Sequence, residues 1–160
     1  MTKTTYNVLI VGAGDIGSGY DNPNSLEVLT HAHAFVKHDG FALIGFVEPN
    51  NVVGLNAAKK WSTSTFTTIR EAFSENDIDV VSVAAPDNYH FEILKEIARF
   101  NPRFVLAEKP LTNTIDEARE ILSIFNSKKI AALVNYKRRF IPEFLSRGRG
   151  EFGGKGGIFT

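Results

Sequence analysis

The sequence predicts an α/β fold, a doubly wound parallel sheet with helices on both faces. Short apolar, β-branched runs alternate with segments of helical periodicity, the pattern of strands joined by crossover helices. The runs are almost continuously apolar, as strands covered on both faces are. A chain of 160 residues, 43% of them hydrophobic, is long enough to bury its own core. The expected strands are Asn7–Val11, Ala42–Val47, Ser64–Phe66, Val80–Ala84, Phe104–Ala107 and Ile130–Val134.

Helices between these strands are indicated by capping boxes and by apolar spacing. Thr68 precedes Glu71 by three residues, and Thr114 precedes Glu117 by three, so each pair predicts a helix start. Apolar residues also recur at i, i+3 and i+7. Right-handed crossovers would then give the doubly wound sheet. The residues that carry the spacing are Phe91, Leu94 and Ala98, and Ile115, Ala118 and Leu122.

The bulk composition excludes several functional classes. Lys plus Arg equals Asp plus Glu at 18 each, so the chain has no net charge to recruit nucleic acid or an anionic membrane. The absence of cysteine excludes disulfides, thiolate metal sites and thiol catalysis. Residues 1–6 lack the apolar run of a signal peptide, and no stretch approaches a membrane span. We therefore expect a cytoplasmic protein with neither nucleic-acid nor membrane partners.

The end of the chain differs from the rest. Residues 147–160 contain six glycines and keep no helical or strand period, so we expect one domain over residues 1–146 and a glycine-rich tail over 147–160. The run Arg147-Gly148-Arg149-Gly150 is similar to RNA-binding glycine–arginine tails. It has few repeats and no interleaved aromatic residues, which makes RNA binding the weakest alternative.

A glycine loop, Gly12-Ala13-Gly14-Asp15-Ile16-Gly17, directly follows the first expected strand. In such a loop Gly12 permits the tight turn, Gly14 lets the backbone approach a pyrophosphate, and Gly17 allows close helix–strand packing. The following helix N-terminus supplies amide donors and the positive end of a dipole. Asp15 is expected to face outward, since a carboxylate would repel the phosphates. The loop predicts a dinucleotide site, with the alternative that the glycines merely permit a turn.

Glu48 closes the second expected strand, where an acid can accept hydrogen bonds from the adenosine ribose and repel a 2′-phosphate. No Lys or Arg follows it until Lys59, so NAD is favoured over NADP. Glu48 lies 31 residues after Gly17 rather than the usual ~20, which leaves open a plain solvated acid before Pro49.

The extra length lies in Ser18–Asn24, where a glycine and a proline interrupt the first expected helix. We expect a helix to restart near Ser25 and to run through His31 and His33 toward His38. Residues two apart on a helix do not face each other, and no carboxylate is spaced to join these histidines. Packing or support of the loop is therefore favoured over a metal site.

Polar residues follow the later strands as well: Ala85-Pro86 with His90, then Glu108-Lys109-Pro110-Leu111, then Asn135 to Phe140. Each alone can be read as a polar cap on a buried strand. Together with the glycine loop they lie at carboxyl ends of parallel strands, the edge at which open α/β sheets bind ligands. A lysine at this edge can polarise or protonate a carbonyl oxygen while hydride moves.

These motifs resemble the glucose–fructose oxidoreductase, inositol dehydrogenase and MocA-like (Gfo/Idh/MocA) family over nearly the whole chain, to about Phe144. The resemblance rests on the glycine loop, on the Ala85-Pro86 to His90 element, on Glu108-Lys109-Pro110-Leu111, and on Arg139-Phe140 followed by Pro142. It implies a Rossmann domain and NAD(P)-dependent oxidation or reduction of a sugar, cyclitol or related polyol. It also implies that Lys109 is the catalytic lysine near the nicotinamide and the substrate hydroxyl.

The resemblance has further implications and two departures. Ala85 stands where the family commonly has threonine, and the second α/β domain that forms much of the family's substrate pocket, and usually its oligomer interface, is expected to be absent. The interruption at Ser18–Asn24 resembles a branch associated with surface-polysaccharide sugars. We therefore expect the nucleotide-binding half of an oxidoreductase, the alternative being a stand-alone NAD-binding module or a remnant without turnover. The expected cofactor-binding residues are Gly12, Ala13, Gly14, Asp15, Ile16, Gly17, Glu48, Ala85, Pro86, His90, Glu108, Lys109, Asn135 and Arg139.

Overall fold

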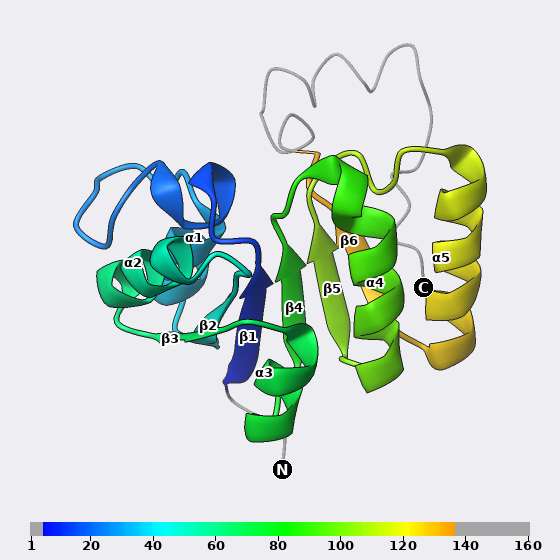
Figure 1. Ribbon diagram of the computed structural model, residues 1–160, viewed down its shortest axis with the longest axis horizontal. Coiled ribbons are helices and arrows are strands. Elements are labelled where there is room, and N and C mark those ends of the chain that lie inside the picture. The colour runs from blue at the N-terminus through cyan, green and yellow to red at the C-terminus, as the bar shows by residue number, and fades with distance from the viewer. Residues whose placement is uncertain (1–4, 137–160) are drawn as a thin grey trace.

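A computed structural model describes residues 5–136, which form one six-stranded parallel sheet with helices on both faces (Figure 1). The strand order is β3-β2-β1-β4-β5-β6, the doubly wound arrangement predicted from the sequence. The strands are β1 (Tyr6–Val11), β2 (Phe41–Val47), β3 (Ser64–Phe66), β4 (Val80–Val83), β5 (Phe104–Ala107) and β6 (Ala131–Val134). The helices are α1 (His31–Lys37), α2 (Asn51–Trp61), α3 (Ile69–Glu75), α4 (His90–Phe100) and α5 (Ile115–Lys128), with short turns η1 (Asp15–Gly19) and η2 (Asp87–Tyr89).

Alternate residues of the strands feed two cores, one on each face of the sheet. Leu9 and Val11 of β1 belong to the core under α3, α4 and α5, whereas Val8 and Ile10 belong to the core under α1 and α2. In Figure 1, α4 and α5 lie together on one side of the sheet, and α1 and α2 gather over its β1–β3 half. The chain reverses its winding between β1 and β4, which places the switch point of the sheet beside the glycine loop.

The expected double coverage is correct for the centre of the sheet and wrong for one edge. All of β4 is buried, as are the last four residues of β1. In β5, Val105 and Ala107 are buried but Phe104 and Leu106 only half-buried, and β6 is half-buried throughout. The reason is that α1 and α2 pack on β1, β2 and β3, so no helix within residues 5–136 covers that face of β5 and β6.

The expected helix restart near Ser25 is wrong. The glycine loop enters a single π-helical turn, η1, and the chain then runs without helix until Thr30 caps α1, its hydroxyl accepting from the His33 amide. The predicted start at Thr114 is a complete capping box, whereas Glu71 bonds the amide of Thr67 rather than that of Thr68. Glycine and proline in Ser18–Asn24 end the first helical turn early. The next helix begins only at Thr30, whose amide and hydroxyl are bonded to Asp21.

The described residues contain neither a helix that could span a membrane nor a cluster of metal ligands. None of the helices there combines the length and the apolarity that crossing a bilayer requires. Residues 5–136 also contain no group of three or more His, Asp or Glu side chains placed to hold a metal ion.

Candidate functional site

The three glycines of the loop after β1 stand in different surroundings. Gly12 has φ +97°, and a Cβ there would lie 2.7 Å from the backbone nitrogen of Ala85. A Cβ on Gly17 would overlap the carbonyl oxygen of Gly12. A Cβ on Gly14 would have no protein atom within 4 Å, and its backbone is in the extended region that any residue adopts. Packing explains Gly12 and Gly17, but it leaves the space beside Gly14 open.

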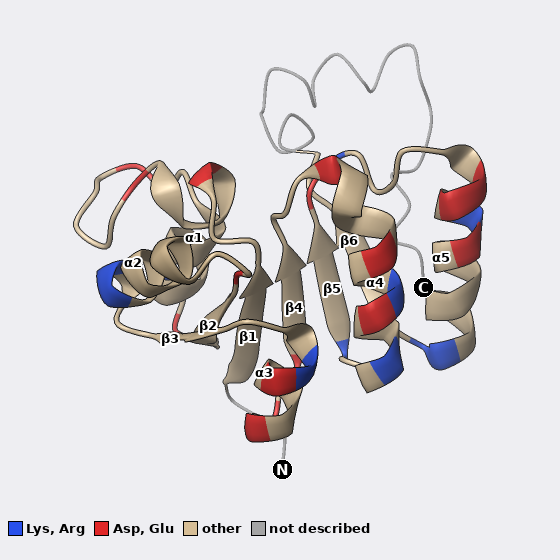
Figure 2. Ribbon diagram, viewed as in Figure 1, with Lys and Arg blue, Asp and Glu red and all other residues tan. Residues whose placement is uncertain are grey.

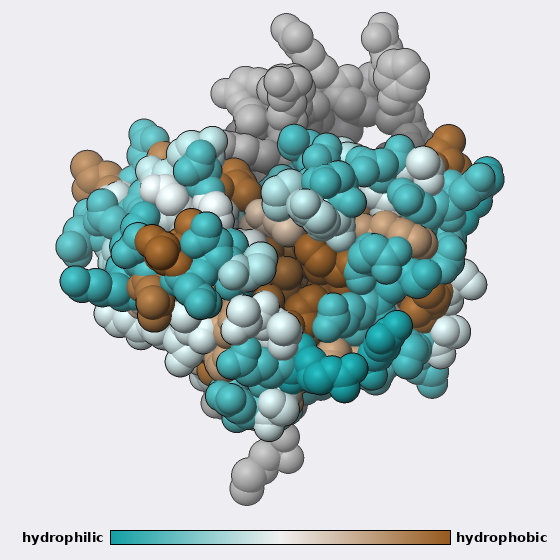
Figure 3. Space-filling view, in the orientation of Figure 1, coloured by the Kyte–Doolittle hydropathy of each residue, from teal (hydrophilic) through white to brown (hydrophobic). Residues whose placement is uncertain are grey.

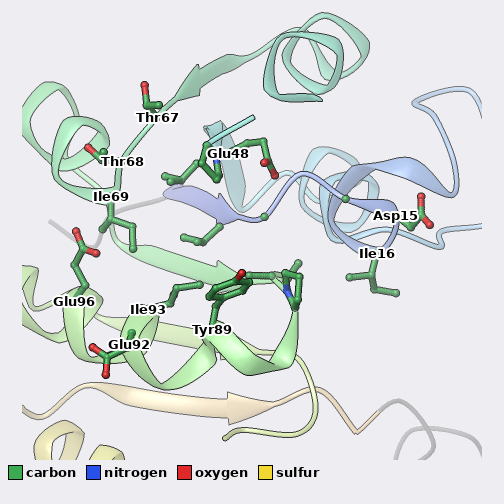
Figure 4. Close-up of a pocket in the computed structure, with 18 of the residues that line it drawn as sticks. Asp15, Ile16, Glu48, Thr67, Thr68, Ile69, Tyr89, Glu92, Ile93 and Glu96 are labelled. Carbon is green, nitrogen blue, oxygen red and sulfur yellow. The ribbon is translucent and has the colours of Figure 1, made fainter. Parts of the chain in front are cut away.

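That space is part of a pocket of about 840 Å³ at the carboxyl ends of β1, β2 and β4. Figure 3 shows apolar side chains gathered in a hollow in the middle of the face that is turned toward the viewer, with hydrophilic ones around it. In Figure 4, Tyr89 and Ile93 approach the pocket from the side opposite Glu48, and Ile69 closes one end. Such a mostly apolar cleft at the switch point is suited to a nucleotide. The other lining residues are Val11, Gly12, Gly14, Asp15, Ile16, Tyr20, Val47, Pro49, Thr67, Thr68, Ala84, Ala85, Pro86, Glu92 and Glu96.

Glu48 reaches back from the end of β2 to the glycine loop. Its Oε2 accepts from the Ala13 amide at 3.1 Å, and its Oε1 accepts from the Asn50 amide at 3.0 Å. Each carboxylate oxygen has two lone pairs, so both oxygens keep acceptor capacity toward the pocket. Glu48 therefore fixes the loop and can still receive hydroxyl donors.

The charged residues that line this pocket are all acidic. Asp15, Glu48, Glu92 and Glu96 line it, and none of the lining residues in the described part of the chain is Lys or Arg. Figure 2 shows both acidic and basic positions along α4, of which only the acidic Glu92 and Glu96 line the pocket. Asp15 is exposed, and in Figure 4 its carboxylate points away from the middle of the pocket, as its expected outward orientation requires. The donors available to an anionic ligand are therefore uncharged: backbone amides and the hydroxyls of Tyr20, Thr67, Thr68 and Tyr89.

His90, the first residue of α4, is buried and does not line the pocket. Its Nδ1 lies 2.7 Å from the carbonyl oxygen of Pro110, and its Nε2 lies 2.9 Å from that of Ala85. The ring therefore joins the turn after β4 to the turn after β5. Two residues of the glycine loop itself, Ala13 and Gly17, are likewise buried and do not line the pocket.

Glu108, Lys109 and Asn135 line a second pocket of about 870 Å³, which meets the first at Ile16. This pocket extends over the sheet face that α1 and α2 leave open, past Leu106. The residues predicted to share one crevice are thus divided between two adjoining pockets at the same sheet edge. Arg139 lies outside the described residues, as do the expected domain boundary at 146 and the Arg147–Gly150 run.

A buried hydrogen-bond network holds the end of β5. Glu108 Oε1 lies 3.0 Å from His31 Nε2 and accepts from Asn135 Nδ2 at 2.6 Å. The other ring nitrogen of His31, Nδ1, lies 2.6 Å from the Ser82 hydroxyl. Burial alone would raise the pKa of Glu108, but the hydrogen bonds from His31 and Asn135 outweigh it and hold that pKa below its usual value. Glu108 is an ionised acceptor beside Lys109.

A second buried carboxylate organises the interruption after the glycine loop. Asp21 accepts from the amides of Leu29 and Thr30, from the Thr30 hydroxyl and from His33 Nδ1, which lies 2.8 Å away. Burial raises the pKa of Asp21, but these hydrogen bonds, led by that from Thr30, bring it below the usual value. Lys60 Nζ donates to the carbonyl oxygens of Ser18, Gly19 and Asp21 itself. The interruption is therefore tied to both α1 and α2.

Sequence reasoning missed several residues of the two pockets. His31 lines the second pocket, and its partner Ser82, which lines neither pocket, could have been noticed as a polar residue inside an apolar strand. Thr67 and Thr68 follow β3, whose three residues gave only a weak strand signal. Tyr89 lies in a turn before α4, and nothing in its local pattern distinguishes it from a solvent-exposed residue.

Comparison with known proteins identifies a relationship over the whole described sheet. The Gfo/Idh/MocA model, described as an oxidoreductase family with an NAD-binding Rossmann fold, matches residues 6–136. The rhizopine catabolism protein MocA of Rhizobium meliloti is 28% identical over 88% of this chain and 40% of its own length. Inositol 2-dehydrogenase of Corynebacterium glutamicum is 28% identical over 84% of this chain and 37% of its own length. The chain thus spans about two fifths of these relatives.

Solved structures agree on the fold. The WlbA dehydrogenase of Chromobacterium violaceum, in complex with NADH and UDP-GlcNAcA, superposes with a TM-score of 0.79 at 19% identity, over 93% of this chain and 40% of that one. GenD2 from gentamicin A biosynthesis, in complex with NAD, gives 0.77 at 21% identity, over 91% and 38%. With its glycine loop, its sheet order and the match over residues 6–136, the chain belongs to the Gfo/Idh/MocA oxidoreductase family and contains that family's NAD-binding Rossmann fold.

Proposed function

We propose that this chain is the NAD(H)-binding half of an oxidoreductase that moves hydride to or from a carbon of a sugar, cyclitol or related polyol. The observation that carries the proposal is the open space beside Gly14. Two glycines of the loop are explained by contacts within the fold, whereas a Cβ on Gly14 would meet no protein atom within 4 Å. A dinucleotide pyrophosphate that approaches the backbone there supplies the missing reason for a glycine.

The donor set of the pocket fits NAD better than NADP. The first amides of η1 have no partner within the turn, and Gly14, Asp15 and Ile16 line the pocket, so these amides would be available to the phosphates. Glu48 offers acceptor oxygens to ribose hydroxyls and would repel a 2′-phosphate. Because Glu92 and Glu96 add to the same negative field and no basic residue of the described chain lines the pocket, a third phosphate would find no counter-charge.

Residues of the first pocket would bind the cofactor, and a residue of the second pocket would transfer the proton. A bound nicotinamide would supply or accept the hydride. The amides at the start of η1 would hold the pyrophosphate, and Glu48 would orient the ribose. Lys109, exposed in the adjoining pocket, would donate a proton to the substrate oxygen in reduction, or accept it in oxidation, and Glu108 would keep the neighbouring backbone in place.

Two kinds of relatives support the proposed substrate class. The matched inositol dehydrogenase acts on a cyclitol by its name, and the WlbA structure contains a sugar nucleotide. The second pocket of this chain combines polar groups at Glu108, Lys109 and Asn135 with an apolar floor, which suits a polyhydroxylated ring with one less polar face. Since the chain spans about two fifths of its relatives, turnover is proposed for an assembly in which a further domain completes this pocket.

Calorimetric titration of the chain with NADH and with NADPH tests the proposal. We expect NADH to bind more tightly than NADPH. Gly14→Val should raise the Kd for NADH by tenfold or more, about 1.4 kcal/mol, because its side chain fills the space reserved for phosphate. Gly14→Ala, whose single added carbon has no protein atom within 4 Å, serves as the stability control for this position. An unchanged Kd for Gly14→Val would contradict the assignment of the loop.

A further inference from the structure

The two histidines of the His31-Ala32-His33 run have different partners, although both are buried at the start of α1. His31 lies between Ser82 of β4 and Glu108 at the end of β5. His33 points to the other side and bonds Asp21 in the interruption before the helix. Each ring is therefore tied to a different carboxylate, so the two side chains can be separated by experiment.

We propose that His31 is a positioning residue for Lys109: it fixes the carboxylate of Glu108, and with it the end of β5 that presents the lysine. Asp21, through its bonds to the amide and hydroxyl of Thr30 at the helix cap, holds the start of α1 where His31 can reach Glu108. This inference rests on the proposed function for the role of Lys109, but the geometry that it describes can be tested in the absence of any cofactor.

Glu108 is held by groups from three parts of the chain. Its Oε1 accepts from His31 of α1 and from Asn135 after β6, and its Oε2 accepts from the backbone amide of Lys109 at 3.3 Å. The side chain of Glu108 is only 14% exposed, so solvent competes little for these bonds. A carboxylate gripped at one oxygen and bonded to the next residue at the other restricts the backbone that carries Lys109.

An ionised Glu108 can only accept, so Nε2 of His31 carries the hydrogen that faces it, and Nδ1 faces the Ser82 hydroxyl. Ser82 lies at the centre of β4 and is completely buried. When its hydroxyl donates to Nδ1, the neutral ring carries its hydrogen on Nε2, the nitrogen that faces Glu108. Ser82 therefore orients His31 as a donor to the carboxylate, and its side chain is satisfied within an otherwise apolar strand.

The interruption after the glycine loop provides the anchor for this arrangement. Asp21 accepts from the Thr30 amide and hydroxyl at the helix cap and from His33 one turn further. Lys60 of α2 bonds three carbonyl oxygens of the same segment. The residues that lengthen the first crossover thus determine where α1 begins, and this start places His31 within reach of Glu108.

Carbon-detected NMR titration of the side-chain carboxyls in the chain tests the proposal, with His31→Gln and His33→Gln as a matched pair. The groups that face Glu108 are His31, Asn135 and the Lys109 amide. We expect His31→Gln to shift the titration midpoint of Glu108 upward and the Lys109 amide resonance with it, while the midpoint of Asp21 stays unchanged. His33→Gln should shift Asp21 upward and leave Glu108 unchanged.

Two outcomes would overturn the proposal: both variants moving both carboxyls alike, as general loosening of α1 would produce, or His31→Gln leaving Glu108 and the Lys109 amide unmoved. If His31→Gln does not fold, Ser82→Ala serves in its place, because it keeps His31 and removes only the orienting hydroxyl. It should shift Glu108 in the same direction by less, and an unmoved Glu108 would again overturn the proposal. NADH binding is measured separately, so failure of the cofactor assignment would not be confused with failure of this one.

Discussion

The turns after β1 and after β5 present polar groups at the same edge of the sheet, but they are built in different ways. The first is shaped by backbone: Gly12 and Gly17 are required because neighbouring main-chain atoms leave no room for a Cβ. The second is shaped by side chains, since Glu108 is held by His31 and Asn135 from distant parts of the sequence. A backbone-shaped turn is sensitive to one added methyl group, whereas a side-chain network is sensitive to protonation.

The largest effect on stability should come from a methyl group added to the turn after β1. Gly17→Ala puts a Cβ onto the carbonyl oxygen of Gly12, so the loop or η1 must shift. We expect the free energy of unfolding to fall by about 1–3 kcal/mol, the usual cost of overpacking. Urea denaturation followed by circular dichroism measures it.

Gly14→Ala is the matched control for Gly17→Ala, three residues away in the same loop. Its Cβ meets no protein atom within 4 Å, so its unfolding free energy should stay within about 0.5 kcal/mol of the parent value. Equal destabilisation by the two variants would mean that the glycines serve the fold alike, and it would remove the distinction on which the pyrophosphate assignment rests.

The same contrast explains how much of the molecule could be predicted from the sequence. The glycine loop and all six strands were correctly located, because apolar runs and glycine spacing are local signals. The start of α1 was placed too early, since the capping residue, Thr30, is itself held by Asp21, nine residues earlier in the chain. Tertiary hydrogen bonds of this kind leave no periodic trace in the sequence.

The network around Glu108 was unpredictable for a similar reason. Its histidine partner lies 77 residues away, and Ser82 lies 51 residues from that histidine. Sequence reasoning placed Glu108 correctly at a strand end, but it could not tell that the carboxylate faces the buried ring of His31 on α1. It also joined into one crevice what the structure divides into two pockets meeting at Ile16.

Lowering the pH should reduce the unfolding free energy through the buried carboxylates, and this effect should be of intermediate size. The pKa of Glu108 is lower in the fold than its ordinary value of 4.5, so its stabilising contribution is complete above that pH and is lost as the pH falls through the folded-state pKa. Asp21 behaves in the same sense, because its pKa is also lowered. We therefore expect the unfolding free energy to decline as the pH falls below about 4.5.

Glu108→Gln isolates the part of this decline that belongs to one carboxylate. Glutamine keeps an oxygen acceptor for His31 and Asn135 but takes up no proton. The slope of unfolding free energy against pH should therefore become shallower in the variant, by at most about 1.4 kcal/mol per pH unit. Urea denaturation at intervals between pH 6 and 3 gives both slopes, and identical slopes for parent and variant would show that Glu108 is not a source of the acid sensitivity.

The smallest expected effect on cofactor binding distinguishes the two regions by function. Lys109 is exposed in the second pocket and does not line the first, so Lys109→Ala should change the Kd for NADH by less than about twofold, where Gly14→Val changes it tenfold or more.

In any assembly of this chain that turns over a polyol, the same variant should lower kcat by about 10²-fold or more, the contribution of a positioned acid–base group. Calorimetry and steady-state kinetics measure the two quantities. A Kd raised as much as in Gly14→Val would assign Lys109 to the nucleotide site, and an unchanged kcat would exclude it as the proton donor, because a group that protonates the substrate oxygen acts on the chemical step rather than on the binding of the nucleotide.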